Sequence, residues 1–162
     1  MTLLVNRYIE RLGDSGKVLA VRIKPKSDLL KSLHSIVEEN GIKAGVILSG
    51  VGLLCKERLR NCKTLPKEYP IADVNRSYLS FERPMEILAL SGNISDVESQ
   101  PLIHAHIILS YIDKDEIRVI GGHLIEGCIV YGFAEVILME LKGITMKKGF
   151  DDETKTQQLF VK

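Results

Sequence analysis

The feature that most restricts the fold is the regular alternation of apolar and polar residues in the segment 101–112. An extended strand places every second side chain on the same face, so the odd-numbered residues of 103–111 form one apolar face. The opposite face carries His104 and His106, which an extended chain separates by roughly 6.6 Å. The pattern predicts a strand that packs one face on a core and gathers imidazoles on the other.

A third histidine follows after a predicted turn at 113–116, where the chain can return as an antiparallel strand. A two-residue loop places His104 opposite His123, and a four-residue loop places His106 there. Both registers bring the three imidazoles to one face, because directly opposed residues share a face. An odd loop length turns His123 away, unless the two glycines before it form a bulge.

Three neutral imidazoles that converge are the ligand set of a zinc-type site with an open fourth position. The alternative interpretation is that these are surface or core histidines satisfied by hydrogen bonds. We predict a divalent metal ion, zinc, bound by His104, His106 and His123. The pattern assigns no catalytic residue.

The composition fits one globular domain that spans residues 1–162. Hydrophobic residues make up 45% of the chain and charged residues 27%, which supplies a core without disulfides. The net charge of +1 predicts no dominant basic field and weighs against strong nonspecific duplex binding.

The three cysteines and the apolar runs indicate the cellular compartment. Cys55, Cys62 and Cys128 lack a paired metal-binding spacing and predict free thiols. No apolar run has the features of a signal peptide or a membrane span, so we expect a soluble, cytoplasmic protein that does not bind membranes.

One helix is expected in the first quarter of the chain. A β-branched strand over 18–23 ends before Pro25. Ser27 is then predicted to cap a helix whose apolar stripe ends at Gly41. A short apolar strand over 44–49 follows, with both of its faces buried.

The next strand, over 53–60, is predicted to be separate, with a bend at 50–52 before it. It carries Lys56, Arg58 and Arg60 on one face, as a charged edge strand does. This basic face is also the local feature that favours nucleic-acid binding.

Two acids stand alone in apolar strands. The polar segment 61–76 is predicted to run around the sheet, and strands are expected over 84–92 and 128–141. Glu86 and Glu135 lie within these last two strands, where a buried carboxylate needs a partner. The pattern therefore predicts one main helix among many strands.

Several segments in order resemble the plant- and prokaryote-conserved domain, also known as domain of unknown function 296, which forms the C-terminal part of plant AT-hook nuclear proteins. The resemblance covers roughly residue 19 to the C-terminus and rests on the segments 45–52, 86–93, 101–110, 121–128 and 134–136. It implies a single domain of the α/β (α+β) class, with a mixed, largely antiparallel sheet packed by one main helix, that assembles as a homotrimer. In prokaryotic members it implies a histidine cluster that holds a metal ion, here His104, His106 and His123. The chain contains no Arg-Gly-Arg-Pro arm of the kind that enters an A·T-rich minor groove.

Three functions compete at this point. The first is a homotrimeric binding module that holds zinc or a similar divalent ion, with a small anionic ligand at the open position. The second is a DNA-binding or chromatin-associated protein, which the basic strand face favours. The third is a metal-dependent hydrolase or lyase, with Glu86 or Glu126 as the general base.

Assembly is predicted from the sheet itself. The apolar runs 44–49, 85–91 and 128–141 supply more two-sided hydrophobic strand than one helix can cover. A closed oligomer hides such a surface, and the family resemblance selects the homotrimer. Glu86 and Glu135 would then find partners on a neighbouring chain.

Overall fold

The sheet is organised around its longest strand, β2 (Gly45–Cys62), which changes partners along its length. The computed structural model describes residues 8–162. The first half of β2 lies between β4 (Met85–Val97) and β7 (Ile129–Lys142), and the second half pairs with β3 (Arg76–Phe81) and β6 (Glu116–Leu124). The residues 44–60 therefore form one continuous central strand, and the predictions of two separate strands and of a charged edge were wrong.

The change of partners takes place where β2 is irregular. The pairing with β7 shifts register after Gly52 and again after Leu54. Gly52 has a φ of 157°, and a Cβ at this position would overlap the backbone of β7. The glycine therefore allows a close approach of two strands at the bend, as a bulge does.

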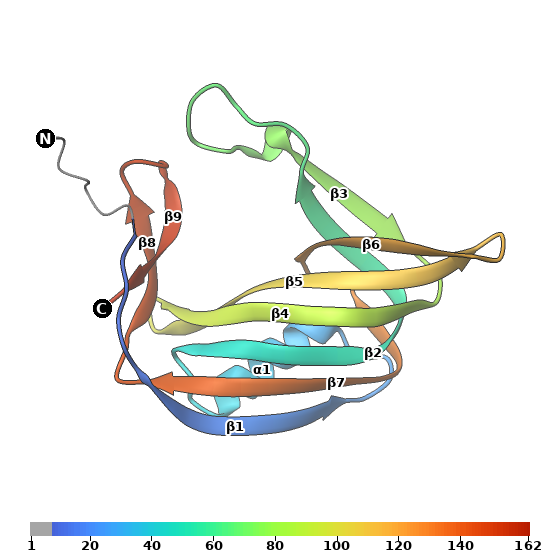
Figure 1. The fold of residues 1–162 in the computed structure, drawn as a ribbon, viewed down its shortest axis with the longest axis horizontal. Helices are drawn as coiled ribbons and strands as arrows, with labels where there is room; N and C mark the ends of the chain where they lie inside the picture. The colour runs from blue at the N-terminus through green and yellow to red at the C-terminus, as the bar shows by residue number, and fades with distance from the viewer. Residues whose placement is uncertain (1–7) are drawn as a thin grey trace, which may run out of the picture.

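The remaining strands complete a nine-stranded mixed sheet (Figure 1). β5 (Gln100–Asp113) lies antiparallel between β4 and β6, and β1 (Asp14–Ile23) pairs with β7 at one edge. At the other edge β8 (Met146–Asp151) and β9 (Thr156–Val161) form a hairpin, joined to β4 by one parallel pair. The segment 63–75 runs outside the sheet, as predicted, and contains only the short 3₁₀ helix η1 (Asp73–Asn75).

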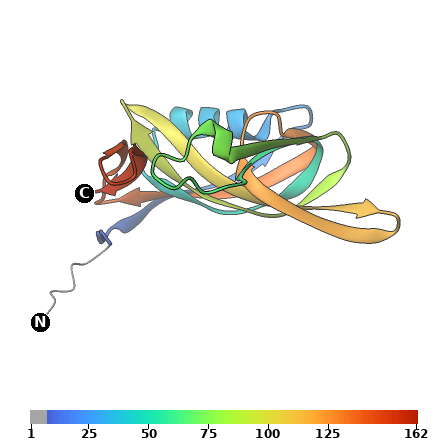
Figure 2. The same cartoon turned by 90° about the horizontal axis from the view of Figure 1, so that it is seen from above.

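The one α-helix within residues 8–162, α1 (Leu29–Glu39), covers one face of the sheet (Figure 2). Its apolar stripe of Leu29, Leu30, Leu33 and Val37 is buried against core residues of β5 and β7. The predicted helix is confirmed, but its cap is one residue later than expected.

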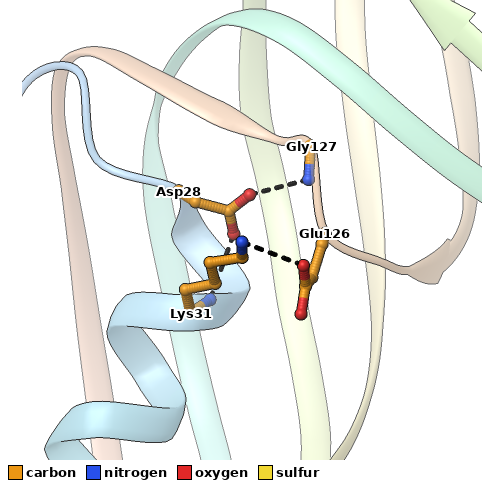
Figure 3. Close-up of polar contacts among 4 residues, drawn as sticks. All are labelled: Asp28, Lys31, Glu126 and Gly127. Carbon is orange, nitrogen blue, oxygen red and sulfur yellow. Dashed lines mark hydrogen bonds and ion pairs between the residues drawn. The ribbon is translucent and has the colours of Figure 1, made fainter.

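The helix begins after Asp28, whose carboxylate accepts a hydrogen bond from the Lys31 backbone N–H at 3.0 Å. The second oxygen of Asp28 accepts from the Gly127 N–H at 2.7 Å (Figure 3). One side chain therefore caps the helix and also bonds it to the connection between β6 and β7. The single, shorter hydroxyl of Ser27 could not make both bonds. The helix ends at Glu39 with Asn40 as its C-cap, and Gly41 follows with a φ of 67°.

The other face of the sheet is not covered by the described residues. Side chains that alternate with the core positions of β2, β4, β5, β6 and β7 are exposed there: Val51, Leu88, Ile108, Val119, Tyr131 and Phe133. We call this set the open apolar face. Glu135 lies opposite Val51 in the β2–β7 pairing and is exposed on the same face.

Candidate metal centre

The β5–β6 hairpin sets the register of the three histidines. Its turn consists of Lys114 and Asp115, both with positive φ (49° and 66°), which is the conformation of a two-residue hairpin turn of type I′. Asp113 then pairs with Glu116, and His106 lies directly opposite His123. The expectation that a two-residue loop places His104 opposite His123 was therefore wrong. The turn is centred between Lys114 and Asp115, and this centre gives the His106 register that was expected for a four-residue loop.

The three imidazoles converge on one face. Their ring centroids are separated by 4.9 Å (His104 and His123), 5.3 Å (His104 and His106) and 5.4 Å (His106 and His123). One nitrogen from each ring lies within 4.8 Å of the others. Zinc–nitrogen bonds of about 2.0–2.1 Å in a tetrahedron require nitrogens roughly 3.4 Å apart, so small side-chain rotations would complete the set. None of the three side chains is buried, which leaves the fourth position accessible.

Strand β2 holds the third histidine in place. Arg60 pairs with His123 across β2 and β6, and the Asn61 side chain donates to the Gly121 carbonyl at 2.9 Å. A Cβ on Gly122 would overlap the side chain of Asn61. The two glycines thus form no bulge but let β2 approach β6 closely beside His123.

A cavity of about 590 Å³ opens above the histidines. Its walls come from the second half of β2, from the segment 63–75 and β3, and from the β8–β9 hairpin, which flank β5 from two sides (Figure 1). Arg60, Arg76 and Lys148 contribute cations to these walls. No aspartate or glutamate lies among the described residues that line the cavity.

The surroundings of His104 and His123 favour the neutral imidazole. Partial burial, followed by the nearby charges of Arg60, the other two histidines and Arg76, lowers the pKa of His123 to about 4. Burial, followed by Lys148, also lowers the pKa of His104. A neutral imidazole keeps a lone pair free, which is the form that binds a metal ion.

Asn93 is a residue of the site that the sequence did not reveal. It lies on β4 directly opposite His104 and therefore shares its face. Its Oδ1 atom is buried and has no hydrogen-bond partner. An orphaned acceptor beside a histidine fits a metal centre, because a ligating imidazole usually donates its other N–H to such an oxygen.

The acids proposed as a general base lie elsewhere. Glu86 is exposed on β4 and pairs with Ser110, four residues along β5 from His106, or roughly 13 Å. Glu126 forms an exposed ion pair with Lys31 at 3.1 Å, next to the start of α1 (Figure 3). The prediction that Glu86 and Glu135 are buried was wrong, because both point to the side of the sheet away from α1.

The basic face of β2 is divided. Lys56 is paired with Glu82 at 2.6 Å, whereas Arg60 lines the cavity. Arg58 packs against Gly127, in the connection between β6 and β7. The three cations therefore do not present one continuous surface.

A different acid is buried, and it was not singled out by the sequence pattern. Glu57 of β2 has no exposed surface, and neither of its carboxylate oxygens has a hydrogen-bond partner. Burial raises the pKa of Glu57 to about 7, against the opposing influence of Arg83. Burial likewise raises the pKa of the Cys128 thiol to about 11; Cys55, Cys62 and Cys128 are all free thiols, as expected.

These features define a small mixed-sheet domain with one covering helix and an open histidine cluster at the floor of a cation-lined cavity. The sequence pattern of the Plants and Prokaryotes Conserved (PCC) domain matches residues 10–142. The chain belongs to this family, as the resemblance in its sequence predicts.

Solved structures share the fold closely. A metal-containing protein from Archaeoglobus fulgidus is 27% identical, with a TM-score of 0.76 over 94% of this chain and 99% of its own. A plant- and prokaryote-conserved protein from Pyrococcus horikoshii is 23% identical, with a TM-score of 0.76 over 96% and 99% of the two chains. A candidate DNA-binding protein from Bacteroides thetaiotaomicron is 23% identical, with a TM-score of 0.72 over 93% and 98%.

A curated relative is much longer. The bifunctional protein GlmU of a Synechococcus strain is 33% identical over 126 residues, which are 78% of this chain but 17% of that protein. The chain thus spans about a sixth of the curated relatives that it matches. Within residues 8–162, no helix has the length and apolar character needed to cross a membrane.

Proposed function

We propose that this domain binds a divalent metal ion, zinc, through His104, His106 and His123. The observation that carries the proposal is that the three imidazoles each place a nitrogen within 4.8 Å of the others. The buried, unpartnered Oδ1 of Asn93 beside His104 supports it. The relative from Archaeoglobus fulgidus described as metal-containing supports it as well.

The residues have separate roles in this proposal. The three histidines hold the ion, and Asn93 fixes the orientation of His104 by accepting its second N–H. The bound ion supplies a Lewis-acidic position that can hold an anion or a polarised oxygen. The cations of the cavity wall favour a small anionic ligand at that position.

Metal analysis of untagged protein tests the site. After incubation with zinc and removal of excess by gel filtration, we expect one zinc per chain, and a loss of most of it in His104→Ala. The matched control is His34→Ala, which removes the one histidine of the sequence that lies outside the cluster, on α1. Equal zinc content in wild type and His104→Ala would refute the site.

The domain is also proposed to form a homotrimer. The open apolar face carries six large exposed side chains on adjacent strands, more than scattered surface residues provide. Sedimentation equilibrium should give three times the chain mass of 18.1 kDa. A monomer at all concentrations would contradict the proposal.

DNA binding is the second candidate. It is favoured by the neighbour from Bacteroides thetaiotaomicron described as a candidate DNA-binding protein and by a similar description of a Ralstonia eutropha protein. The division of Lys56, Arg58 and Arg60 reduces the local charge that would contact phosphates. Duplex binding that persists near physiological salt and falls steeply with added salt would support this candidate.

The predicted general bases of the hydrolase or lyase alternative lie away from the histidines. Neither Glu86 nor Glu126 lines the cavity, and among the described residues no other carboxylate does. A binding function therefore fits the site better than acid–base catalysis by these residues.

A further inference from the structure

Three cations converge on the cavity from different parts of the chain. Arg60 comes from β2, Arg76 from the start of β3 and Lys148 from β8. Among residues 8–162, the side chains of Arg60 and Lys148 have no hydrogen-bond or ion-pair partner, and that of Arg76 donates only to the Ile71 carbonyl at 3.3 Å. The cavity wall therefore holds three positive charges that no carboxylate balances.

The charges are close enough to influence the floor of the cavity. Arg60 lies directly opposite His123 in the β2–β6 pairing, and Arg76 and Lys148 line the same cavity as the histidines. Lys148 also borders a second cavity that contains Glu98, yet no carboxylate raises its pKa, and burial alone lowers it. Uncompensated like charges that face one partly enclosed space are costly unless an anion neutralises them.

The C-terminal hairpin completes this wall. β8 and β9 lie beyond residues 10–142, which the family pattern covers. Gln158 Nε2 donates to the hydroxyls of Thr154 and Thr156 at 3.2 and 3.0 Å, and Thr154 also donates to Asp151 at 2.7 Å. These bonds order the polar side of the hairpin that faces the cavity, next to Lys148.

The segment before β3 adds apolar side chains to the cavity. Tyr69 and Ile71, from the segment between β2 and β3, offer an aromatic ring and an aliphatic side chain. A volume of about 590 Å³ is in the range that holds an organic ligand of moderate size. The cavity thus combines three cations with two apolar side chains, and Arg76 lies next to Ile71.

We propose that this cavity binds a small organic molecule that carries a doubly charged oxyanion, a phosphate ester or a dicarboxylate. Arg60, Arg76 and Lys148 hold the oxyanion, and the uncharged part of the molecule packs on Tyr69 and Ile71. The proposal deepens the proposed function, in which zinc forms the floor of the same cavity. The anion-binding wall consists of residues other than the metal ligands, so it is expected to work in metal-free protein as well.

Isothermal titration of EDTA-treated, dialysed protein at pH 7.5 tests the proposal. The probes are orthophosphate, phenyl phosphate, succinate and acetate. We expect either the phosphates or succinate, which carry two charges, to bind more tightly than acetate. If the phosphates bind more tightly than succinate, phenyl phosphate should bind more tightly than orthophosphate. Preference for phosphate or for succinate identifies the source of the oxyanion.

A matched pair of variants separates the cavity from general charge. Lys148→Gln removes a cavity cation and should weaken binding of the preferred anion about tenfold or more, the loss expected for one charge-assisted hydrogen bond. Lys147→Gln removes the same charge from the neighbouring, exposed position of β8 and should change it less than about twofold. Circular dichroism spectra of both variants establish that the hairpin is folded.

The other outcomes overturn the proposal. Equal losses in the two variants, or no binding of any probe, would refute an anion site at Lys148. So would binding that requires added zinc and is unaffected by Lys148→Gln. Duplex DNA that binds through Lys148 more tightly than the small anions do would also refute the proposal. Failure of the metal site alone appears differently, as absence of zinc in protein that still binds the anion.

Discussion

The buried acid Glu57 should make the stability of this domain depend on pH in a direction opposite to that of most carboxylates. Its pKa is raised from 4.5 to about 7 in the folded chain because burial disfavours the charged form. Below pH 4.5 the carboxyl is protonated in both the folded and the unfolded states, and the full stability is present. Between pH 4.5 and 7 the unfolded chain releases the proton while the folded chain retains it, so the free energy of unfolding falls as pH rises.

The size of this effect follows from the two pKa values. At 1.36 kcal/mol per pH unit, the loss amounts to about 3 kcal/mol and levels off above pH 7. Glu57→Gln removes the ionisation. The amide leaves its own polar group unsatisfied at a cost of about 1–3 kcal/mol, but that cost is the same at every pH. The free energy of unfolding of the variant, relative to wild type, should therefore rise by about 3 kcal/mol between pH 4.5 and 8.

Urea denaturation followed by circular dichroism at pH 4.5, 6, 7 and 8 measures this difference, with EDTA present and the protein concentration fixed. Glu86→Gln, at an exposed glutamate on the neighbouring strand β4, is the control and should show no comparable trend. A difference between wild type and Glu57→Gln that stays constant across this range would refute the reasoning. So would one that falls as pH rises.

Three further predictions concern the metal site and the helix. Asn93→Leu should lower zinc affinity 10- to 100-fold, as loss of a partner of a metal-bound histidine commonly does; competition with a chromophoric chelator measures it, and an unchanged affinity would remove Asn93 from the site. Because the pKa of His123 is lowered to about 4, protons should compete weakly with the metal at that ligand, and zinc should stay bound below pH 6.5 in an equilibrium dialysis series; half-release at or above pH 6.5 would contradict this. Asp28→Ala should lower the free energy of unfolding by about 2 kcal/mol, because the helix loses its cap and its bond to Gly127. Lys31→Ala, which removes only an exposed ion pair, should cost less than about 1 kcal/mol, and equal losses in these two variants by urea denaturation would refute the capping role.

What the sequence predicted well depends on local geometry. Alternation along β5 and a short turn suffice to bring His104, His106 and His123 together, because a two-residue turn fixes which residues face each other. The helix was predicted for the same reason, although the bond from Asp28 to Gly127, 99 residues away, moved its cap by one position.

What the sequence could not predict depends on pairing between distant segments. Glu57 lies among alternating charged residues and is buried only because β2 becomes a central strand. Glu86 lies among apolar residues and is exposed, since its face of the sheet is the uncovered one. The cavity, in turn, needs β2, β3 and β8 to meet, and no local pattern encodes that meeting.

His106 and Ile108 are two residues apart on β5, so they share the face of the sheet that α1 does not cover. The metal site and the open apolar face are thus neighbours on one surface. A trimer that formed through this face would bring a second chain to the border of the histidine cluster. Occupancy of the site and association of the chains would then be linked equilibria, in which zinc strengthens assembly by the same factor by which assembly strengthens zinc binding.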